Sequence, residues 1–234
     1  MKPIIEDAIA DVENSFREMA EMVLSQLTLL DKYISGNHEN TVRELIDDIT
    51  ENERKIDSME VVVSEKFINT VALYQPVALD VRRLVSIYRI TINLERIGDL
   101  VMNIIYSAEE IRDTAEYKAM SEVILNMLIS GKFMVEKSLL SFENSDKDYA
   151  VWTIKNDEVV DDMNRKLLIN SISKANVSKK TKEMLISYAD LKNIITNIER
   201  IADHATNIAE ASIYSMQGTD IRHTRQIEGD LKEE

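Results

Sequence analysis

The chain has 234 residues, no cysteine and a formal net charge of −14, and 44% of its residues are hydrophobic. The lack of cysteine excludes disulfides, iron–sulfur clusters and thiolate zinc sites, and fits a reducing compartment. The acidic balance, without a Lys/Arg cluster, argues against a nucleic-acid-binding surface. Only five glycines and two prolines interrupt a composition rich in helix-forming residues, so we expect a nearly all-α protein.

The N-terminal segment and the distribution of apolar residues predict where the protein works. MKPIIEDAIADVENS interleaves charges with apolar residues, and so lacks the apolar core of a secretory signal. No uninterrupted apolar run approaches the roughly 20 residues that cross a bilayer. We therefore expect a soluble, cytoplasmic protein.

Three long helices are predicted in the first half. Apolar residues in 5–34 step alternately by four and three positions until Gly36 interrupts them, which is typical of a helix buried along one seam. A second helical pattern covers 46–67 and ends at the Gln-Pro turn. Pro76 is expected in the first turn of the third helix, where its missing N–H would have no partner anyway, and this helix continues to Ile104.

The second half repeats this plan. Its first apolar pattern covers 120–139, and the Asn-Ser-Asp sequence at 144–146 suits the cap of a new helix. That helix is expected over 148–169 and to end within 171–178. A last helix then reaches about Met216.

A duplicated motif explains why the halves look alike. NLERIGDLVMNI begins at Asn93 and NIERIADHATNI at Asn197, 104 positions later, and seven of twelve columns match, where unrelated segments would share about one. The chain is therefore predicted to be two tandem three-helix bundles, joined end to end or side by side near 112–116. The expected bounds are 1–113 for the first bundle, 114–217 for the second and 218–234 for a polar C-terminal tail.

The repeated motif places oxygen ligands on one helix face. Within each copy Glu, Asp and Asn recur at i, i+4 and i+8, which forms a stripe along a helix. The same offset aligns Glu53 with Asp157 and Asp57 with Asp161 on the second helix of each half. Glu53 stands where the apolar pattern requires a hydrophobic residue, so its carboxylate needs a cation, a basic partner or water. Two helices that present such acidic pairs to each other would form a cation site, and the pattern therefore predicts one.

A purely structural network is the alternative, with Arg96 and Arg200 as the partners of these acids. Oxygen ligands suit hard cations such as Mg²⁺, Mn²⁺, Ca²⁺ or iron, whereas zinc and copper usually take His or Cys. A di-iron oxygenase would need Glu-x-x-His, but His204 lies five residues after Glu199 and is interpreted as an exposed or capping histidine. No phosphate loop, catalytic triad or thiol nucleophile is present, so no enzyme activity is expected.

Several segments together resemble the PhoU family of accessory regulators of phosphate-specific transport. They are the two ERI-x-D-x-x-x-N copies, QPVALDVR at 75–82, the E/D-x-x-x-D pairs of the second and fifth helices, and IYSMQGTDIRHT near the C-terminus. The resemblance covers almost the whole chain. In the second half SKANVSKKTKEM replaces the Gln-Pro turn, so any partner contact made by Gln75, Asp80 and Arg82 would be confined to the first half.

The resemblance implies a cytoplasmic, non-catalytic protein that restrains the phosphate-starvation response. It implies that the protein communicates between the ATPase subunit of the phosphate ABC transporter and a membrane sensor histidine kinase. We expect it to be a homodimer that reaches the membrane through partners only, and its charge predicts no binding of nucleic acid. It also implies that the acidic motifs hold divalent or trivalent metal ions or clusters (iron, zinc, manganese or magnesium). Carried over by position, the ligands are Glu53, Asp57, Glu95, Asp99 and Asn103, then Asp157, Asp161, Glu199, Asp203 and Asn207.

Two alternatives remain open. A metal-free helical scaffold would use the same acids only for ion pairs. A related metal-binding regulator of a different transporter would share the scaffold and differ in its partner, because sequence pattern specifies a fold better than a function.

Overall fold

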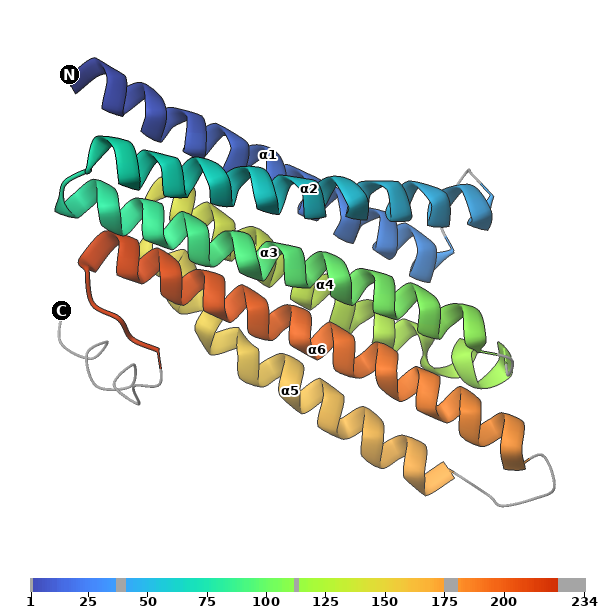
Figure 1. The fold of residues 1–234 in the computed structure, drawn as a ribbon. Coiled ribbons are helices and arrows are strands. Elements are labelled where there is room, and N and C mark those ends of the chain that lie inside the picture. The colour runs from blue at the N-terminus through green and yellow to red at the C-terminus, as the bar shows by residue number, and fades with distance from the viewer. Residues whose placement is uncertain (1, 37–40, 112–113, 175–180, 223–234) are drawn as a thin grey trace, which may run out of the picture.

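The computed structural model describes residues 2–36, 41–111, 114–174 and 181–222, and this part of the chain is helical almost throughout, without a strand. The helices are α1 (Lys2–Ser35), α2 (Val42–Tyr74), α3 (Ala78–Glu110), α4 (Thr114–Asn144), α5 (Lys147–Lys174) and α6 (Thr181–Gln217). Figure 1 shows them lying along one common long axis. The predicted all-α fold is confirmed.

The two bundles lie side by side and not end to end. Helices α1, α2 and α3 pack together, as do α4, α5 and α6, and the bundles meet where α3 packs on α6 and α1 on α4 (Figure 1). One hydrophobic core runs through both, from Val12 and Leu27 in α1 to Ile198 and Ile208 in α6. The duplicated helices α3 and α6 therefore form the centre of the molecule, where their apolar faces bury each other.

The turn between α2 and α3 differs from the prediction. Gln75 adopts the left-handed conformation (φ 48°, ψ 60°) at the C-terminus of α2, and α3 begins only at Ala78 after the extended residue Val77. Pro76 therefore lies before α3, and the prediction that placed it in the first helical turn was wrong. A left-handed residue followed by proline ends a helix, because proline cannot continue its hydrogen bonding.

The other helix ends follow from local chemistry. Thr41 and Glu44 form a capping box at the start of α2, which satisfies two free backbone N–H groups. The Asp146 carboxylate accepts the N–H groups of Asp148 (2.9 Å) and Tyr149 (3.4 Å) at the start of α5, as predicted for a cap there. Among the described helices, none has the length and apolarity that crossing a membrane requires.

Candidate metal centres

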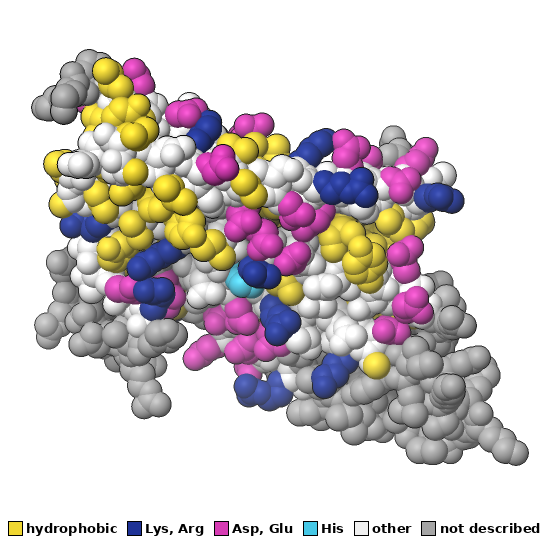
Figure 2. Space-filling model, in the orientation of Figure 1, with side chains coloured by type: hydrophobic (Ala, Val, Ile, Leu, Met, Phe, Trp, Pro, Cys, Tyr) yellow, Lys and Arg dark blue, Asp and Glu magenta, His cyan; other side chains and the backbone are white. Residues whose placement is uncertain are grey.

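The ten predicted ligands lie on two pairs of helices, and we name the groups by half. The first acidic site comprises Glu53 and Asp57 of α2 and Glu95, Asp99 and Asn103 of α3; the second acidic site comprises Asp157 and Asp161 of α5 and Glu199, Asp203 and Asn207 of α6. Figure 2 shows two acidic patches on one face, over α2/α3 and over α5/α6, with a histidine and basic side chains between them.

Glu53 is the innermost group of the first acidic site. Its side chain is buried (8% exposed), its Oε1 atom has no hydrogen-bond partner, and its Oε2 atom accepts a hydrogen bond from the Gln26 amide. Burial, followed by the negative charges of Asp57, Asp99 and Glu95, raises the pKa of Glu53 to about 7, although the Gln26 hydrogen bond lowers it. The fold therefore brings these four carboxylates together around an unpartnered buried oxygen.

Two features of the neighbouring helices hold the Glu53 carboxylate in place. Asn52 donates through Nδ2 to Gln26 Oε1 (2.6 Å) and to the Met22 carbonyl (2.9 Å), which fixes the fully buried Gln26 amide that faces Glu53. On α3, a Cβ atom added to Gly98 would lie 2.6 Å from Glu53 Oε2. Gly98 thus leaves the space that the carboxylate occupies.

The outer part of the first acidic site is partly neutralised by Arg96. Its Nε atom lies 3.4 Å from Glu95 Oε2 and its Nη1 atom 3.2 Å from Asp99 Oδ2, and its side chain is 58% exposed. Burial and then Asp99 nevertheless raise the pKa of Glu95, so Arg96 offsets only part of the repulsion. Asn103, one helical turn beyond Asp99, is exposed.

The second acidic site repeats this arrangement with a shorter inner acid. Asp157 Oδ1 is buried and unpartnered, and burial followed by the charges of Asp203 and Asp161 raises the pKa of Asp157 to about 6, with a smaller contribution from Glu199, although the Thr206 hydroxyl lowers it. Burial and then Asp161 also raise the pKa of Asp203, against the effect of Arg200. Asn207, like its counterpart in the first site, is exposed.

His204 does not lie where the sequence interpretation put it. It is half-buried, its Nδ1 atom lies 2.8 Å from Asn93 Oδ1, and it thereby joins α6 to α3. Burial, followed by the charges of Arg96 and Arg200, lowers its pKa. The interpretation as an exposed or capping residue was wrong, because the His204 ring contacts a side chain of α3 and not a helix end; its counterpart Leu100 is buried.

Sequence reasoning missed Gln26 and Asn52, although one signal was present. The alternating steps of four and three through Met19, Val23 and Leu30 place position 26 on the buried seam, and a polar residue on such a seam needs a hydrogen-bond partner. Asn52 carries no comparable signal.

The donor set fits a hard cation in chemistry and charge. Each site gathers four carboxylates, one of which presents a buried oxygen without a partner, and carboxylates with amides are the ligands that such ions prefer. No group of three or more His, Cys, Asp or Glu side chains among the described residues is already arranged to hold a metal ion. The side chains would therefore have to rotate toward an ion, and the ligand set stays a prediction.

Comparison with known proteins matches both halves to one family. The model of the PhoU domain matches residues 16–108 and again 120–212. Similar curated proteins are phosphate-specific transport system accessory protein PhoU homologs. That of a Burkholderia species is 29% identical and covers 92% of this chain and 90% of its own; that of Aquifex aeolicus is 31% identical, covering 67% and 70%.

Solved structures of the same name share the fold. The crystal structure of PhoU from Pseudomonas aeruginosa has a TM-score of 0.74 at 24% identity and covers 92% of this chain and 99% of its own. That of the phosphate transport system regulatory protein PhoU from Streptococcus pneumoniae has a TM-score of 0.72 at 20% identity, covering 92% and 98%. With both halves matched by the domain model, the chain belongs to the PhoU family.

Proposed function

We propose that this protein is a non-catalytic accessory regulator of phosphate-specific transport that restrains the phosphate-starvation response. The observation that carries the proposal is the match of the PhoU domain to both halves of the chain, together with relatives that bear the accessory-protein name and align over about nine-tenths of their length. It works on the cytoplasmic side and reaches the membrane only through its partners.

The two acidic sites are the proposed metal centres of this regulator. The first would hold its ion with Glu53, Asp57, Glu95, Asp99 and Asn103, and the second with Asp157, Asp161, Glu199, Asp203 and Asn207. A bound divalent or trivalent cation, such as iron, zinc, manganese or magnesium, supplies positive charge that offsets the mutual repulsion of the carboxylates. The raised pKa values of Glu53 and Asp157 support this role, because burial and then the neighbouring carboxylates disfavour the charged form of each, and a bound cation would favour it.

In the proposed mechanism the metal-loaded bundles present a rigid helical surface to two partners. These are the ATPase subunit of the phosphate ABC transporter and a sensor histidine kinase, and binding shifts the kinase toward an inhibited state. We propose that the protein does so as a homodimer.

The test replaces one acid of each site. Asp99→Ala combined with Asp203→Ala should lower the metal content measured by elemental analysis after loading with Mn²⁺, and should weaken binding to the purified ATPase subunit or kinase. Tyr106→Ser, an exposed position on α3 outside the acidic sites, is the control. Unchanged metal content and unchanged partner affinity in the double variant would reject this function.

A metal-free scaffold is the second candidate, and the position of Arg96 favours it. Arg96 already contacts Glu95 and Asp99, so these acids have a partner without a metal ion. A scaffold of this kind would contain no metal when purified from its own host, and EDTA would leave both its melting temperature and its partner affinity unchanged.

A further inference from the structure

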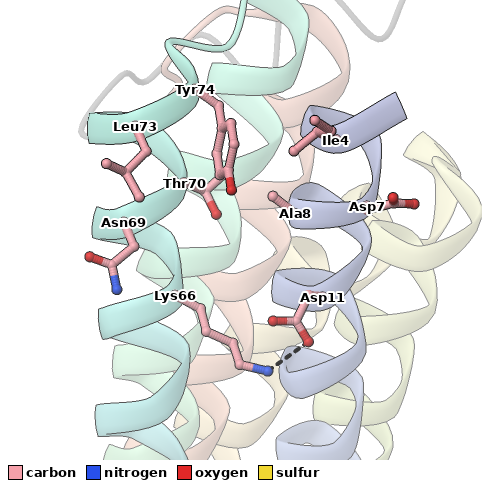
Figure 3. A pocket seen from close by; sticks show the side chains of 9 residues that line it. All are labelled: Ile4, Asp7, Ala8, Asp11, Lys66, Asn69, Thr70, Leu73 and Tyr74. Atoms are coloured by element: carbon pink, nitrogen blue, oxygen red, sulfur yellow. Dashed lines mark hydrogen bonds and ion pairs between the residues drawn. The ribbon is translucent and has the colours of Figure 1, made fainter. Parts of the chain in front are cut away.

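An open groove lies at one end of the first bundle, between the N-terminal turns of α1 and the C-terminal turns of α2. It has a volume of about 410 Å³ and is lined by Ile4, Asp7, Ala8 and Asp11 of α1 and by Lys66, Asn69, Thr70, Leu73 and Tyr74 of α2. We call it the end groove. In Figure 3 the Tyr74 ring stands between the two helices, opposite Ile4 and Ala8.

Large apolar side chains are exposed around the end groove and continue beyond it. Leu73 is 72% exposed, Val77 73%, Leu79 66% and Ile4 55%, and Figure 2 shows apolar side chains gathered at this end of the molecule. Single exposed apolar residues are ordinary on a protein surface, whereas a contiguous group next to a groove marks an interaction site. The left-handed Gln75 and Pro76 fix the chain between Tyr74 and Val77, so these residues are held in position before any partner arrives.

The charges of the end groove favour a basic partner. Lys66 is already neutralised, because its Nζ atom lies 2.7 Å from Asp11 Oδ1 and 2.9 Å from Ser15 Oγ. Asp7 lies on the outer side of α1 (Figure 3), and none of the residues whose side chains the structure describes, which begin at Ile4, forms an ion pair with it. Among the described side chains of the lining, Asp7 is thus the acid without a basic partner, at the outer edge of the groove and on a protein whose net charge is −14, and it would attract Lys or Arg.

The shape of the end groove suits a helix. Two antiparallel helices leave between them a furrow that a third helix can fill, as α3 does on another face of the same pair. An amphipathic helix binds such a furrow through apolar residues spaced i, i+3 or i+4, and i+7. We propose that the end groove is a docking site for an amphipathic helix of a partner protein, with apolar anchors on one face and Lys or Arg along the edge that meets Asp7. This inference rests on the proposed function, since it specifies how a partner is held.

The experiment uses fluorescent peptides of about 20 residues, long enough for a helix of about 30 Å, that tile the transporter's ATPase subunit and the cytoplasmic part of the kinase. We expect binding, measured by fluorescence polarisation, to select peptides with the basic amphipathic pattern. The double variant Leu73→Glu/Val77→Glu should weaken it at least about tenfold, as loss of an apolar anchor does. Asp7→Lys should weaken it less, and added salt should reduce the wild-type affinity. Val61→Glu, on the same helix and 54% exposed but outside the groove, should change it less than twofold.

The remaining outcomes separate this inference from the proposed function. If the intact wild-type protein binds neither the ATPase subunit nor the kinase, the proposed function fails. If it binds an intact partner and Leu73→Glu/Val77→Glu binds equally well, only the docking site is wrong. Loss of self-association in analytical ultracentrifugation, with unchanged peptide binding, would assign the groove to a second copy of the chain. Binding to phosphatidylglycerol vesicles that depends on Leu73 and Val77, without peptide binding, would assign it to lipid. Circular dichroism checks that each variant is folded.

Discussion

The two acidic sites occupy equivalent positions of the repeat but divide the available space differently. In the first site the longer Glu53 side chain lies against Gly98, whose missing Cβ makes room for its carboxylate. In the second site the shorter Asp157 is combined with Ala202 at the position equivalent to Gly98. In the second site the acid is one methylene group shorter, and the residue opposite it on the neighbouring helix carries one additional methyl group. The feature common to both sites is therefore the space for a buried carboxylate, and not the side chain that supplies it.

The polar support of the inner acid differs as well. Glu53 accepts a hydrogen bond from Gln26, which Asn52 holds in turn. The position equivalent to Gln26 is Ser130, whose hydroxyl donates to the Asn126 carbonyl of its own helix (3.0 Å). Glu53 is buried (8% exposed), whereas Asp157 is half-buried, and the hydroxyl that lowers the pKa of Asp157 comes from Thr206 of α6 rather than from the first helix of its bundle. The two inner acids therefore differ in burial and in the helix that supports them.

The largest expected difference between the sites is the change in the free energy of unfolding when the inner acid is replaced by its amide. The pKa of Glu53 rises from 4.5 in an ordinary environment to about 7 in the fold. Between these values the folded chain keeps a proton that the unfolded chain has lost, so the contribution of Glu53 to stability is fully present below about pH 4.5 and is lost as the pH rises through 7. Without metal, Glu53→Gln should therefore increase the free energy of unfolding at pH 8 by about 3 kcal/mol, and change it little at pH 4.5.

Asp157→Asn should act in the same direction but less, by about 1–2 kcal/mol, since solvent screens the partly exposed Asp157. Its window runs from pH 3.8 to about 6. Urea denaturation at several pH values measures both effects. Adding Mn²⁺ at pH 8 should stabilise the wild-type protein more than Glu53→Gln, because the ion needs the charged carboxylate. A Glu53→Gln variant that is less stable than the wild type at pH 8 without metal would contradict the account of an uncompensated buried charge.

Removing the amide support should have the next largest effect. Gln26→Leu keeps a side chain of similar size but removes the hydrogen bond that Glu53 Oε2 accepts and one of the two acceptors of the Asn52 amide, which keeps the Met22 carbonyl. Leaving the buried carboxylate without this donor should cost about 2 kcal/mol. Ser130→Ala at the equivalent position should change the free energy of unfolding by less than about 0.5 kcal/mol. Urea denaturation at pH 7 compares the two variants, and equal losses would show that the two sites are supported alike.

The helices and the two bundles could be predicted from the sequence, whereas the role of Gln26 could not. The apolar spacing and the 104-residue repeat predicted the six helices and two bundles, because long amphipathic helices carry a strong local signal. The same offset paired Glu53 with Asp157, and both lie at the inner positions of their sites. Side-by-side packing of the bundles was left open, since it depends on which faces of α3 and α6 meet, and repetition alone does not determine this.

Long-range polar contacts were the part that sequence could not predict. The hydrogen bonds of Gln26 to Glu53 and of His204 to Asn93 join residues 27 and 111 positions apart. Such contacts depend on how each of the two helices is rotated about its axis, which a periodic pattern does not define closely enough to pair individual side chains. Pro76 was misplaced for a local reason, because the left-handed conformation of Gln75 has no strong signature in a residue other than glycine or asparagine.

Replacing Gly98, the small residue beside the inner acid, should have a smaller effect on stability but a clear effect on the metal affinity of the first acidic site. Gly98→Ala would bring its Cβ to 2.6 Å from Glu53 Oε2 and displace the carboxylate from Gln26. The lost hydrogen bond, about 1 kcal/mol, is roughly offset by the higher helix propensity of alanine, also about 1 kcal/mol. Stability should therefore change by less than about 1 kcal/mol, whereas the Mn²⁺ affinity of the first site should fall about tenfold, for a loss near 1.4 kcal/mol.

Combining Gly98→Ala with Glu53→Asp should recover much of that affinity, because the pair reproduces the Asp157 and Ala202 combination of the second site. Isothermal titration with Mn²⁺ resolves the two sites when Asp203→Ala removes the second. Failure of the double exchange to bind better than Gly98→Ala would mean that the space beside the acid does not determine the difference between the sites.

The smallest expected effect belongs to the arginines at the outer edge of each site, and it discriminates between the two proposed functions. Arg96 is 58% exposed, so its ion pairs should contribute less than about 1 kcal/mol to stability. If the acids bind a metal ion, Arg96 competes with that ion for Glu95 and Asp99. Arg96→Gln should then tighten Mn²⁺ binding a few-fold, and Arg200→Gln should do so at the second site through Asp203, whose pKa Arg200 lowers. If the chain is a metal-free scaffold, each arginine is instead the structural partner of its acids. Both variants would then lose stability at pH 7, and neither would respond to Mn²⁺ in isothermal titration.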